Sequence, residues 1–197
     1  SRLIRRRKEK MEQNTKEFVY YYLSDIGKMT LTSDGENITG LWLEGQKYYG
    51  DIMAVNSPER NNKEEMLPVF KQAKRWLDMY FSGKEPDFSL PLAPKGSPFR
   101  QKVWKMLCDI PYGQVVTYGD IAKALAKESG KAKMSAQAVG GAVGHNPISV
   151  MIPCHRVVGA DGSLTGYAGG IHNKVKLLEL EHADMKSLYI PKKGTAL

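Results

Sequence analysis

The spacing of hydrophobic and polar residues changes along the chain and predicts different elements in each part. Residues 17–50 hold three short segments rich in β-forming residues, EFVYYYLS, GKMTLTS and NITGLWLEG, with the turn residues SDGEN between the last two. Over residues 63–82 the apolar positions recur at helical spacing instead. They are Leu67, Phe70, Ala73, Trp76, Leu77 and Tyr80. The first part should therefore be a small sheet followed by a helix.

The second part of the chain is predicted to be mainly helical. It follows SGKEPDFSLPLAPKGSP, a connection with four prolines and two glycines. Ser97 and Pro98 then supply an N-cap and a first-turn proline. Thr117 and Asp120 fit a capping box at the start of a helix over about 118–126. One face of the helix after Pro98 is lined by Val103, Trp104, Leu107 and Cys108.

The segment MSAQAVGGAVGHNP has almost no large side chains. Ser135 can cap it, but Gly140 and Gly141 in a helix interior each cost on the order of 1 kcal/mol relative to alanine. A smooth helix of this kind favours close approach, either by a neighbouring helix or by a nucleic-acid groove. The polar turn KESGKAK before it suggests a helix-turn-helix, although the turn is longer than usual.

Charge weakly favours a polyanionic partner. The formal net charge is +8 and the pI about 9.3. The segment SRLIRRRKEK, with six Lys or Arg and one Glu, carries +5 of that charge. A solvated tail that binds nothing in particular is the alternative for this segment. We divide the chain into a basic extension at 1–10, expected to be disordered, an N-terminal α/β domain at 11–93, a C-terminal domain at 94–190 and a tail at 191–197.

Membrane and secreted classes are not expected. No apolar run approaches the roughly 20 residues that span a bilayer, and no apolar signal core is seen near the N-terminus. The only cysteines, Cys108 and Cys154, form neither a disulfide framework nor a zinc cluster. We therefore expect a cytoplasmic, reducing location. Cys108 is expected to be an inert thiol in the core.

The stretch ISVMIPCHRVVGADG, residues 148–162, carries the strongest candidate chemistry. Its apolar run predicts a strand that ends at Pro153, which cannot donate to a sheet. Cys154 should then lie at the edge of the core near a cavity mouth, where His155 and Arg156 favour the nucleophilic thiolate. A buried structural cysteine is the alternative. Neighbours in an extended chain point to opposite faces, so Cys154 and His155 should not touch directly.

A histidine base needs an orienting partner. In IHNKVKLLELEH, residues 171–182, Glu181 falls inside the apolar arc of a helix and Glu179 outside it. A carboxylate on a buried face is costly unless paired, which favours His155 as its partner. A Glu181 side chain in water at a frayed helix end is the alternative. Asn146, before Pro147, is expected to hold a turn through its side chain.

These segments resemble the O6-alkylguanine-DNA alkyltransferases, the methylated-DNA–protein-cysteine methyltransferases. NPISVMIPCHRVVG is similar to the active-site region of that family. PFRQKVWKML, IPYGQVVTYGDIA, AVGGAVGHNP and LTGYAGG...KLLELE extend the similarity over most of residues 96–182, and residues 11–93 match more loosely. The resemblance implies an α/β fold with a ribonuclease-H-like N-terminal lobe of sheet plus helix. It also implies a mainly helical C-terminal lobe with a helix-turn-helix.

The resemblance implies a suicidal reaction on double-stranded DNA. An alkyl group on guanine O6, and also on thymine O4, moves to a cysteine after the base is flipped out, once per protein molecule. No metal or organic cofactor is required, and a monomer is expected. By position, Cys154 is the acceptor, His155 its water-bridged base and Glu181 the group that orients the histidine. Asn146 braces the turn, and Tyr118 donates a proton toward the leaving base.

The resemblance also assigns binding residues, with two departures. The base pocket is formed by Val157 and the backbone of Tyr167, Ala168 and Gly169. The DNA-reading helix contributes Ser135, Ala136, Gln137, Ala138, Gly140 and Gly141. Gln137 stands where the family usually inserts an arginine, so duplex affinity should be weaker while activity survives. Ala168 replaces a serine found in some members, a minor change because its N–H remains. No cysteine precedes Cys108, so the N-terminal zinc site of some relatives is not expected.

Two other functions fit parts of this pattern. A lesion sensor would hold alkylated DNA without reacting, but the sensors related to this family lack the cysteine found here at position 154. A thiol hydrolase would use Cys154, His155 and Glu181 as a triad and would process many substrate molecules. If the chain is an alkyltransferase, alkylation of Cys154 should loosen the fold, because the added carbon must fit a pocket bounded by backbone.

Overall fold

The N-terminal lobe is built on a four-stranded sheet with the strand order β3-β2-β1-β4. The computed structural model describes residues 17–47, 59–60 and 66–192, so the predicted basic extension lies outside the described residues. The strands are β1 (Phe18–Ser24), β2 (Gly27–Ser33), β3 (Ile38–Leu43) and β4 (Glu59–Arg60). The first three pair antiparallel, and β4 pairs parallel to β1. The predicted β-rich segments are thus confirmed.

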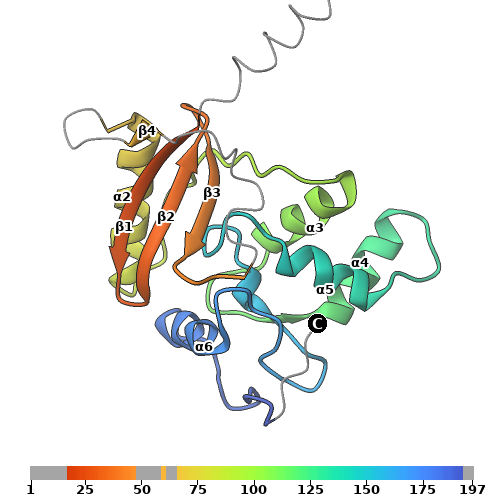
Figure 1. The fold of residues 1–197 in the computed structure, drawn as a ribbon. Helices are drawn as coiled ribbons and strands as arrows, with labels where there is room; N and C mark the ends of the chain where they lie inside the picture. The colour runs from red at the N-terminus through yellow and green to blue at the C-terminus, as the bar shows by residue number, and fades with distance from the viewer. Residues whose placement is uncertain (1–16, 48–58, 61–65, 193–197) are drawn as a thin grey trace, which may run out of the picture.

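Helix α2 (Pro68–Phe81) packs against this sheet (Figure 1). The ring of Phe70 lies 5.5 Å from that of Tyr20 on β1. The buried face of the helix consists of Val69, Phe70, Ala73, Leu77 and Tyr80. The predicted helix is therefore confirmed from Pro68 onward, whereas residues 63–65 lie outside the described residues.

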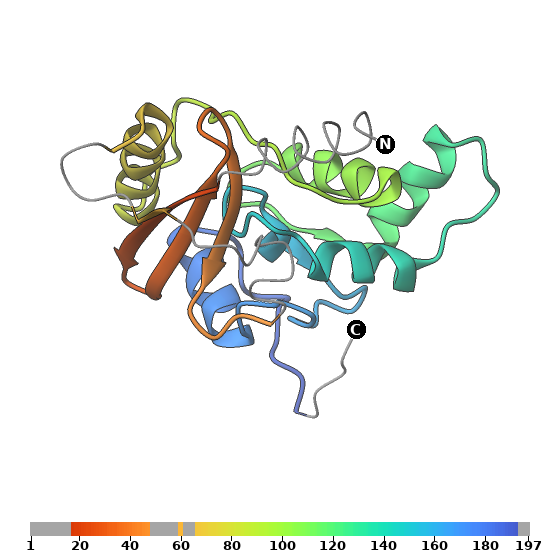
Figure 2. The ribbon, with the colours of Figure 1, turned by 45° about the horizontal axis from the view of Figure 1, so that its top comes forward.

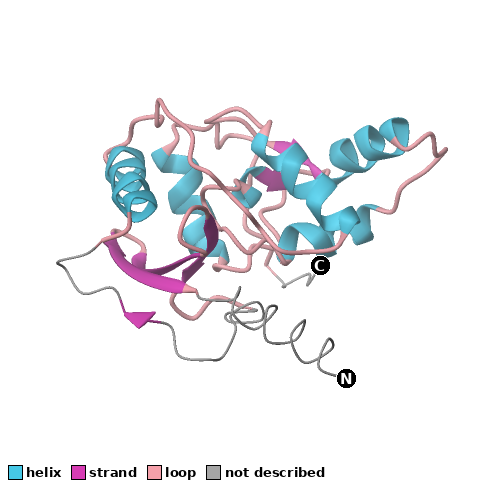
Figure 3. Ribbon diagram, turned by 90° about the horizontal axis from the view of Figure 1, so that it is seen from above, coloured by secondary structure: helices cyan, strands magenta, loops and turns pink. Residues whose placement is uncertain are grey.

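The C-terminal lobe is mainly helical, as expected, and lies beside the sheet lobe (Figures 1 and 3). Its elements are α3 (Pro98–Cys108), β5 (Val116–Thr117), α4 (Tyr118–Glu128), α5 (Ala136–Gly144), the 3-10 helix η1 (Cys154–Arg156), β6 (Val157–Val158) and α6 (Ile171–Leu180). All three predicted caps are present: Ser97 accepts from the Arg100 N–H, Thr117 and Asp120 form a capping box, and Ser135 accepts from the Ala138 N–H.

Helices α4 and α5 form the helix pair that the sequence suggested, joined by a long turn at the edge of the molecule (Figure 2). Helix α5 packs with Val139, Ala142 and Val143 buried, and Trp104 on α3 donates its indole N–H to the Ala142 carbonyl over 2.8 Å. The opposite face of α5 is exposed at its N-terminal end. Small side chains therefore serve both a tight helix contact and a smooth outer surface.

The two lobes meet where β3 pairs with the segment that precedes Cys154. The Leu41 N–H donates to the Pro147 carbonyl over 2.9 Å, and the Ser149 N–H donates to the Leu41 carbonyl over 3.0 Å. One hydrophobic cluster runs across this junction and includes Leu41, Tyr80 and Cys154. The N-terminal sheet thus fixes the segment that carries the candidate nucleophile.

Two expectations about local structure are wrong. The strand predicted before Pro153 is absent, because after the isolated bridge between Ile148 and Leu41 the chain folds into tight turns. Val150 adopts a φ of 70°, and the Met151 N–H donates to the Ser149 carbonyl. Such turns use the backbone groups that a strand would offer to a sheet.

Cys108 is exposed rather than buried. It is the last residue of α3, where the helix extends past the core that holds Trp104 and Leu107. The apolar spacing was correct for the preceding turns, but burial at the end of a helix depends on what covers that end. Within the described parts of the chain, no helix is long and apolar enough to cross a membrane.

Candidate active site

Cys154 begins the 3-10 helix η1 and is held by a turn that Asn146 organises. The Asn146 side-chain N–H donates to the carbonyls of Ile152 (2.8 Å) and Ile148 (3.4 Å), and its oxygen accepts from the Ile148 N–H (3.0 Å). Asn146 follows α5 by two residues, so this helix leads directly into the turn. The prediction that Asn146 holds a turn is confirmed.

The Cys154 thiol is buried, with 5% of the residue exposed, and does not lie at the edge of the core as expected. Burial raises the pKa of the Cys154 thiol, whereas Asn146 and Lys174 act in the opposite direction. The expectation that its neighbours favour thiolate is therefore wrong for the resting protein. The reason is that the 3-10 turn directs the thiol inward, where loss of hydration outweighs nearby positive charge.

His155 is fully buried and makes the predicted pair with Glu181. Its Nε2 lies 2.5 Å from Glu181 Oε2. Burial lowers the pKa of His155 despite the hydrogen bond with Glu181, so the imidazole is neutral near pH 7. Nε2 must then carry the proton that is donated to the carboxylate, and Nδ1, for which the described residues offer no hydrogen-bond partner, keeps its lone pair. This tautomer leaves Nδ1 able to accept a proton.

Glu181 is a buried carboxylate that accepts four hydrogen bonds. Oε2 accepts from His155 Nε2 and from the Tyr80 hydroxyl, both at 2.5 Å. Oε1 accepts from Arg156 Nε at 2.7 Å and from the Gly113 N–H at 3.2 Å. Burial alone would raise the pKa of Glu181, but the bonds from His155 and Arg156 hold it well below its usual range. The alternative of a carboxylate in water is therefore wrong.

Gly113 shows how tightly the chain approaches Glu181. Its φ is 77°, a conformation that favours glycine, and a Cβ here would lie 2.8 Å from the Glu181 carbonyl oxygen. Arg156 is fixed from its other end, because Nη1 donates to the Ile110 carbonyl over 2.7 Å. Neither Gly113 nor Tyr80 was identified from the sequence as a site residue, and Arg156 was expected only to supply charge.

Lys174 is a fully buried lysine that was also missed from the sequence. Its Nζ donates to the carbonyls of Val157 at 2.5 Å and Thr165 at 2.9 Å. Burial lowers its pKa to about 8, while Cys154 acts in the opposite direction. The sequence did indicate a buried position for Lys174, because it precedes Glu181 by seven residues and so lies on the same apolar face of the helix.

Tyr118, assigned as a proton donor, and Tyr167, assigned to the base pocket, both lie near Cys154. Burial and the nearby Cys154 raise the pKa of both Tyr118 and Tyr167, so both phenols stay protonated. The Tyr118 hydroxyl donates to the Thr165 carbonyl over 3.1 Å, the same carbonyl that Lys174 contacts. Val157 is fully buried on β6.

The loop that carries Ala168 and Gly169 reaches the N-terminal lobe. The Lys47 N–H donates to the Ala168 carbonyl over 3.0 Å. A Cβ at Gly169 would lie 2.6 Å from the Leu43 side chain and 2.8 Å from the Tyr167 ring. This close packing explains why residue 169 is a glycine, and it holds the loop against the N-terminal lobe.

The residues assigned to DNA reading lie along α5 and its cap. Gly140 is buried, so it contributes to the contact with neighbouring helices and not to the outer face. Gly141 is exposed and has open space around it. The residues exposed at the start of the helix are Ser135, Ala136, Gln137 and Ala138.

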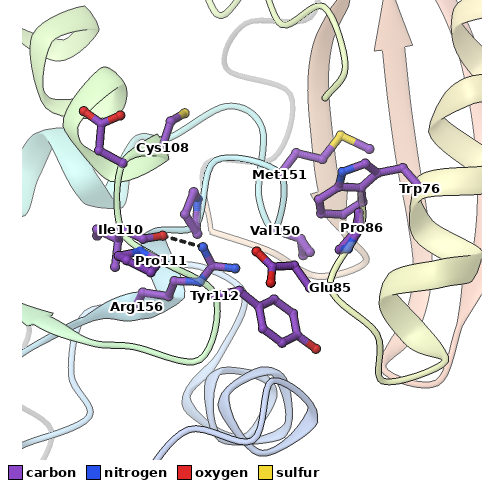
Figure 4. Close-up of a pocket in the computed structure, with 12 residues that line it drawn as sticks. Trp76, Glu85, Pro86, Cys108, Ile110, Pro111, Tyr112, Val150, Met151 and Arg156 are labelled. Carbon is purple, nitrogen blue, oxygen red and sulfur yellow. Dashed lines mark hydrogen bonds between the residues drawn. The ribbon is translucent and has the colours of Figure 1, made fainter. Parts of the chain in front are cut away.

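A cavity of about 220 Å³ lies on the Arg156 side of the site, between the two lobes (Figure 4). Trp76 and Glu85 from the N-terminal lobe line it together with Cys108, Tyr112 and Arg156, and Cys154 does not. The Arg156 guanidinium lies 5.7 Å from the centre of the Tyr112 ring. Among the described residues, no cluster of three or more His, Cys, Asp or Glu side chains could hold a metal ion.

The fold and the site define a two-lobed protein whose helical lobe carries a buried thiol backed by a histidine–carboxylate pair. Residues 18–94 match the family model described as "6-O-methylguanine DNA methyltransferase, ribonuclease-like domain". Residues 98–183 match the model described as "6-O-methylguanine DNA methyltransferase, DNA binding domain". The chain therefore belongs to the methylated-DNA–protein-cysteine methyltransferases, which repair DNA by moving an alkyl group to a protein cysteine. The resemblance seen in the sequence and the fold class that it implied are confirmed.

The similarity to known proteins extends over more than four fifths of the chain. A methylated-DNA–protein-cysteine methyltransferase of Methanosarcina barkeri is 49% identical over 85% of this chain and all of its own length. The Haemophilus influenzae protein of the same name is 42% identical over 82% of this chain and 84% of its own. The structure of Mycobacterium tuberculosis OGT in complex with DNA superposes with a TM-score of 0.66 at 37% identity, covering 84% of this chain and 92% of that one.

Proposed function

We propose that this protein repairs double-stranded DNA by moving the alkyl group of O6-alkylguanine, and of O4-alkylthymine, to Sγ of Cys154. The observation that carries the proposal is a buried thiol, Cys154, directly before the buried His155–Glu181 pair, in a protein that belongs to this family. The reaction forms the S–C bond as the C–O bond to the base breaks. The thioether is stable, so each molecule acts once, and neither a metal nor an organic cofactor takes part.

Proton transfer is the task of the buried residues. A resting thiol must lose its proton to become a nucleophile, because burial raises the pKa of Cys154. Nδ1 of His155 would accept that proton through a water molecule, while Glu181 stabilises the imidazolium that forms. Tyr118, which stays protonated, would donate a proton toward the base as it leaves. The thiol proton thus goes to His155, and the leaving base gains a proton from Tyr118.

The exposed start of α5 would enter a DNA groove, and its small side chains would permit close approach. The damaged base must leave the helix stack to reach Cys154, a residue that is only 5% exposed. Val157 and the backbone of Tyr167, Ala168 and Gly169 would receive it. Gln137 brings no charge to the gap, so we expect weaker duplex binding than an arginine would give.

Three further inferences complete the proposal. We place the domain boundary between residues 93 and 94, in the proline-rich connection. A monomer is sufficient, because all the groups assigned to the reaction come from one chain. A reducing, cytoplasmic location is consistent with a reaction that requires Cys154 as a free thiol.

Intact mass spectrometry tests the proposal. The protein is incubated with a duplex that carries one O6-methylguanine, beside Cys154→Ala and Cys108→Ser variants. A single methyl increment that saturates at one per chain, maps to Cys154 and persists in Cys108→Ser supports the proposal. Binding of the lesion with unchanged mass would favour a sensor instead. Many demethylated duplexes per chain would favour a turnover enzyme. Melting of the methylated product also tests the expected loosening of the fold.

A further inference from the structure

One donor in the hydrogen-bond network of Glu181 comes from the other lobe. His155, Arg156 and Gly113 all belong to the C-terminal lobe. Tyr80 is on α2 of the N-terminal lobe, 101 positions away in sequence, and its hydroxyl lies 2.5 Å from the oxygen that also accepts from His155. The N-terminal lobe therefore contacts the His155–Glu181 pair directly.

The ring of Tyr80 is held in one orientation by aromatic neighbours. Trp76 stacks on it at 5.3 Å with an interplanar angle of 6°. Phe81 and Tyr112 meet it edge-on, at 5.3 Å and 6.3 Å. The residue is fully buried, so the hydroxyl points at Glu181 without help from solvent.

The hydroxyl acts only as a donor to Glu181. Burial and the Glu181 charge raise the pKa of Tyr80 well above its ordinary value, so the proton stays on the phenol. The Tyr80 oxygen is also 3.5 Å from His155 Nε2, but that nitrogen donates to the nearer Glu181 Oε2. Tyr80 and His155 thus share one acceptor atom.

We propose that Tyr80 is a positioning residue for alkyl transfer: its hydroxyl holds Oε2 of Glu181 in line with Nε2 of His155, so that the reaction depends on the N-terminal lobe. This inference rests on the proposed function. Donation from Tyr80 withdraws negative charge from Oε2 and so keeps His155 from becoming too basic. An imidazole that is already protonated cannot accept the thiol proton, so the effect of Tyr80 on the basicity of His155 matters most at acidic pH.

Other charged or titratable groups also face the pair and stay unchanged in the test below. They are Arg156 and Cys154 on η1, Lys174 on α6, Tyr112 before β5 and Tyr167 in the loop before α6.

The test compares Tyr80→Phe with Tyr22→Phe. Tyr22 on β1 is also buried in the N-terminal lobe, and its hydroxyl donates to Asp78 over 2.7 Å. Each variant keeps its ring and loses one hydroxyl–carboxylate bond, but only Tyr80 contacts Glu181. The measured quantity is the rate of methyl transfer from an O6-methylguanine duplex to the full chain in a single turnover, followed from acidic to neutral pH.

We expect Tyr80→Phe to react about tenfold more slowly, roughly the factor that one hydrogen bond to a charged group represents. The acid limb of its pH–rate profile should move to higher pH, because a more basic His155 is protonated earlier as the pH falls. Tyr22→Phe should keep the wild-type rate within about a factor of two and the wild-type pH profile. If both variants show the same rate and the same profile, Tyr80 has no role beyond packing.

Two further measurements keep the inference testable. If Tyr80→Phe does not fold, 3-fluorotyrosine at position 80, a stronger donor, should move the acid limb to lower pH, and an unchanged limb would contradict the proposal. If the wild-type protein transfers no methyl group, the proposed function fails by itself. The pH dependence of Cys154 alkylation by iodoacetamide then tests Tyr80 separately. The acid limb of Tyr80→Phe should again lie at higher pH than that of Tyr22→Phe.

Discussion

Replacing Glu181 by glutamine should damage stability and activity together, because all four acceptor positions of the carboxylate are occupied. Two donors face Oε2 and two face Oε1. A glutamine side chain has one oxygen and one NH₂ group. If the NH₂ group faces Arg156 and Gly113, two groups that can only donate meet a donor. If it faces His155 and Tyr80, both must accept instead, which His155 can do only in its other tautomer. The substitution keeps the size of the side chain, so cavity formation does not contribute.

The expected loss of stability follows from that count. A buried donor left without an acceptor costs about 1–3 kcal/mol, so the first orientation costs about 2–6 kcal/mol and the second costs less. A domain is usually stable by about 5–15 kcal/mol, so Glu181→Gln should be destabilised but still folded. If the NH₂ group faces His155, Nε2 becomes the acceptor and Nδ1 carries the proton. The base is then lost, and methyl transfer should fall by at least about 100-fold.

Urea denaturation and single-turnover methyl transfer measure the two effects, with Glu179→Gln as the matched control. Glu179 is exposed two residues earlier, so its substitution should change stability by no more than about 0.5 kcal/mol. The loss in Glu181→Gln should also depend on pH. Because the folded pKa of Glu181 is depressed, its contribution is full above the unfolded pKa and is lost as pH falls toward the folded one. A loss below about 1 kcal/mol, with unchanged transfer, would refute this account of the site.

Three other substitutions test separate parts of the structure. Gly113→Ala should cost more than Gly130→Ala, by about 1–3 kcal/mol in urea denaturation, because both have positive φ but only the first Cβ would approach another backbone atom, at 2.8 Å; equal losses would contradict the close contact with Glu181. Gln137→Arg should tighten duplex binding and make the slope of log K against log salt more negative by about 0.9, the effect of one added phosphate contact, and an unchanged slope would argue against a DNA contact here. Between pH about 8 and the ordinary lysine pKa of 10.5, Lys174 binds fewer protons in the folded than in the unfolded state. The stability of the wild type relative to Lys174→Met should therefore rise with pH across that window. Parallel stability curves would show that the pKa of Lys174 in the folded state is not depressed.

The sequence by itself determined features that depend on neighbours along the chain. Helix caps at Ser97, Thr117 and Ser135 were predicted because a cap needs only a side chain and an N–H a few residues away. The pairing of Glu181 with His155 was predicted for a related reason. Helical periodicity places Glu181 on a buried face, and a buried carboxylate needs a partner.

Tertiary structure alone decided which donors complete the site. Tyr80 looked like one more apolar position of α2, and Gly113 looked like part of a turn, because nothing near them in sequence indicates that both reach Glu181. Hydrogen bonds between residues 68 and 101 positions apart are fixed by tertiary packing, which no local pattern records. For Gly113 this is packing within the C-terminal lobe, and for Tyr80 it is packing between the lobes.

The state of the nucleophile was decided in the same way. Adjacent His155 and Arg156 suggested a thiolate, but the pKa of Cys154 depends on the total burial of the thiol, to which both lobes contribute. Asn146 and β3 bind backbone groups of the segment that precedes the 3-10 turn, including the Ile152 carbonyl and the Ser149 N–H, and so fix where the turn begins. The residues determined which chemistry is available, and the packing determined that it begins from a neutral thiol beside a neutral base.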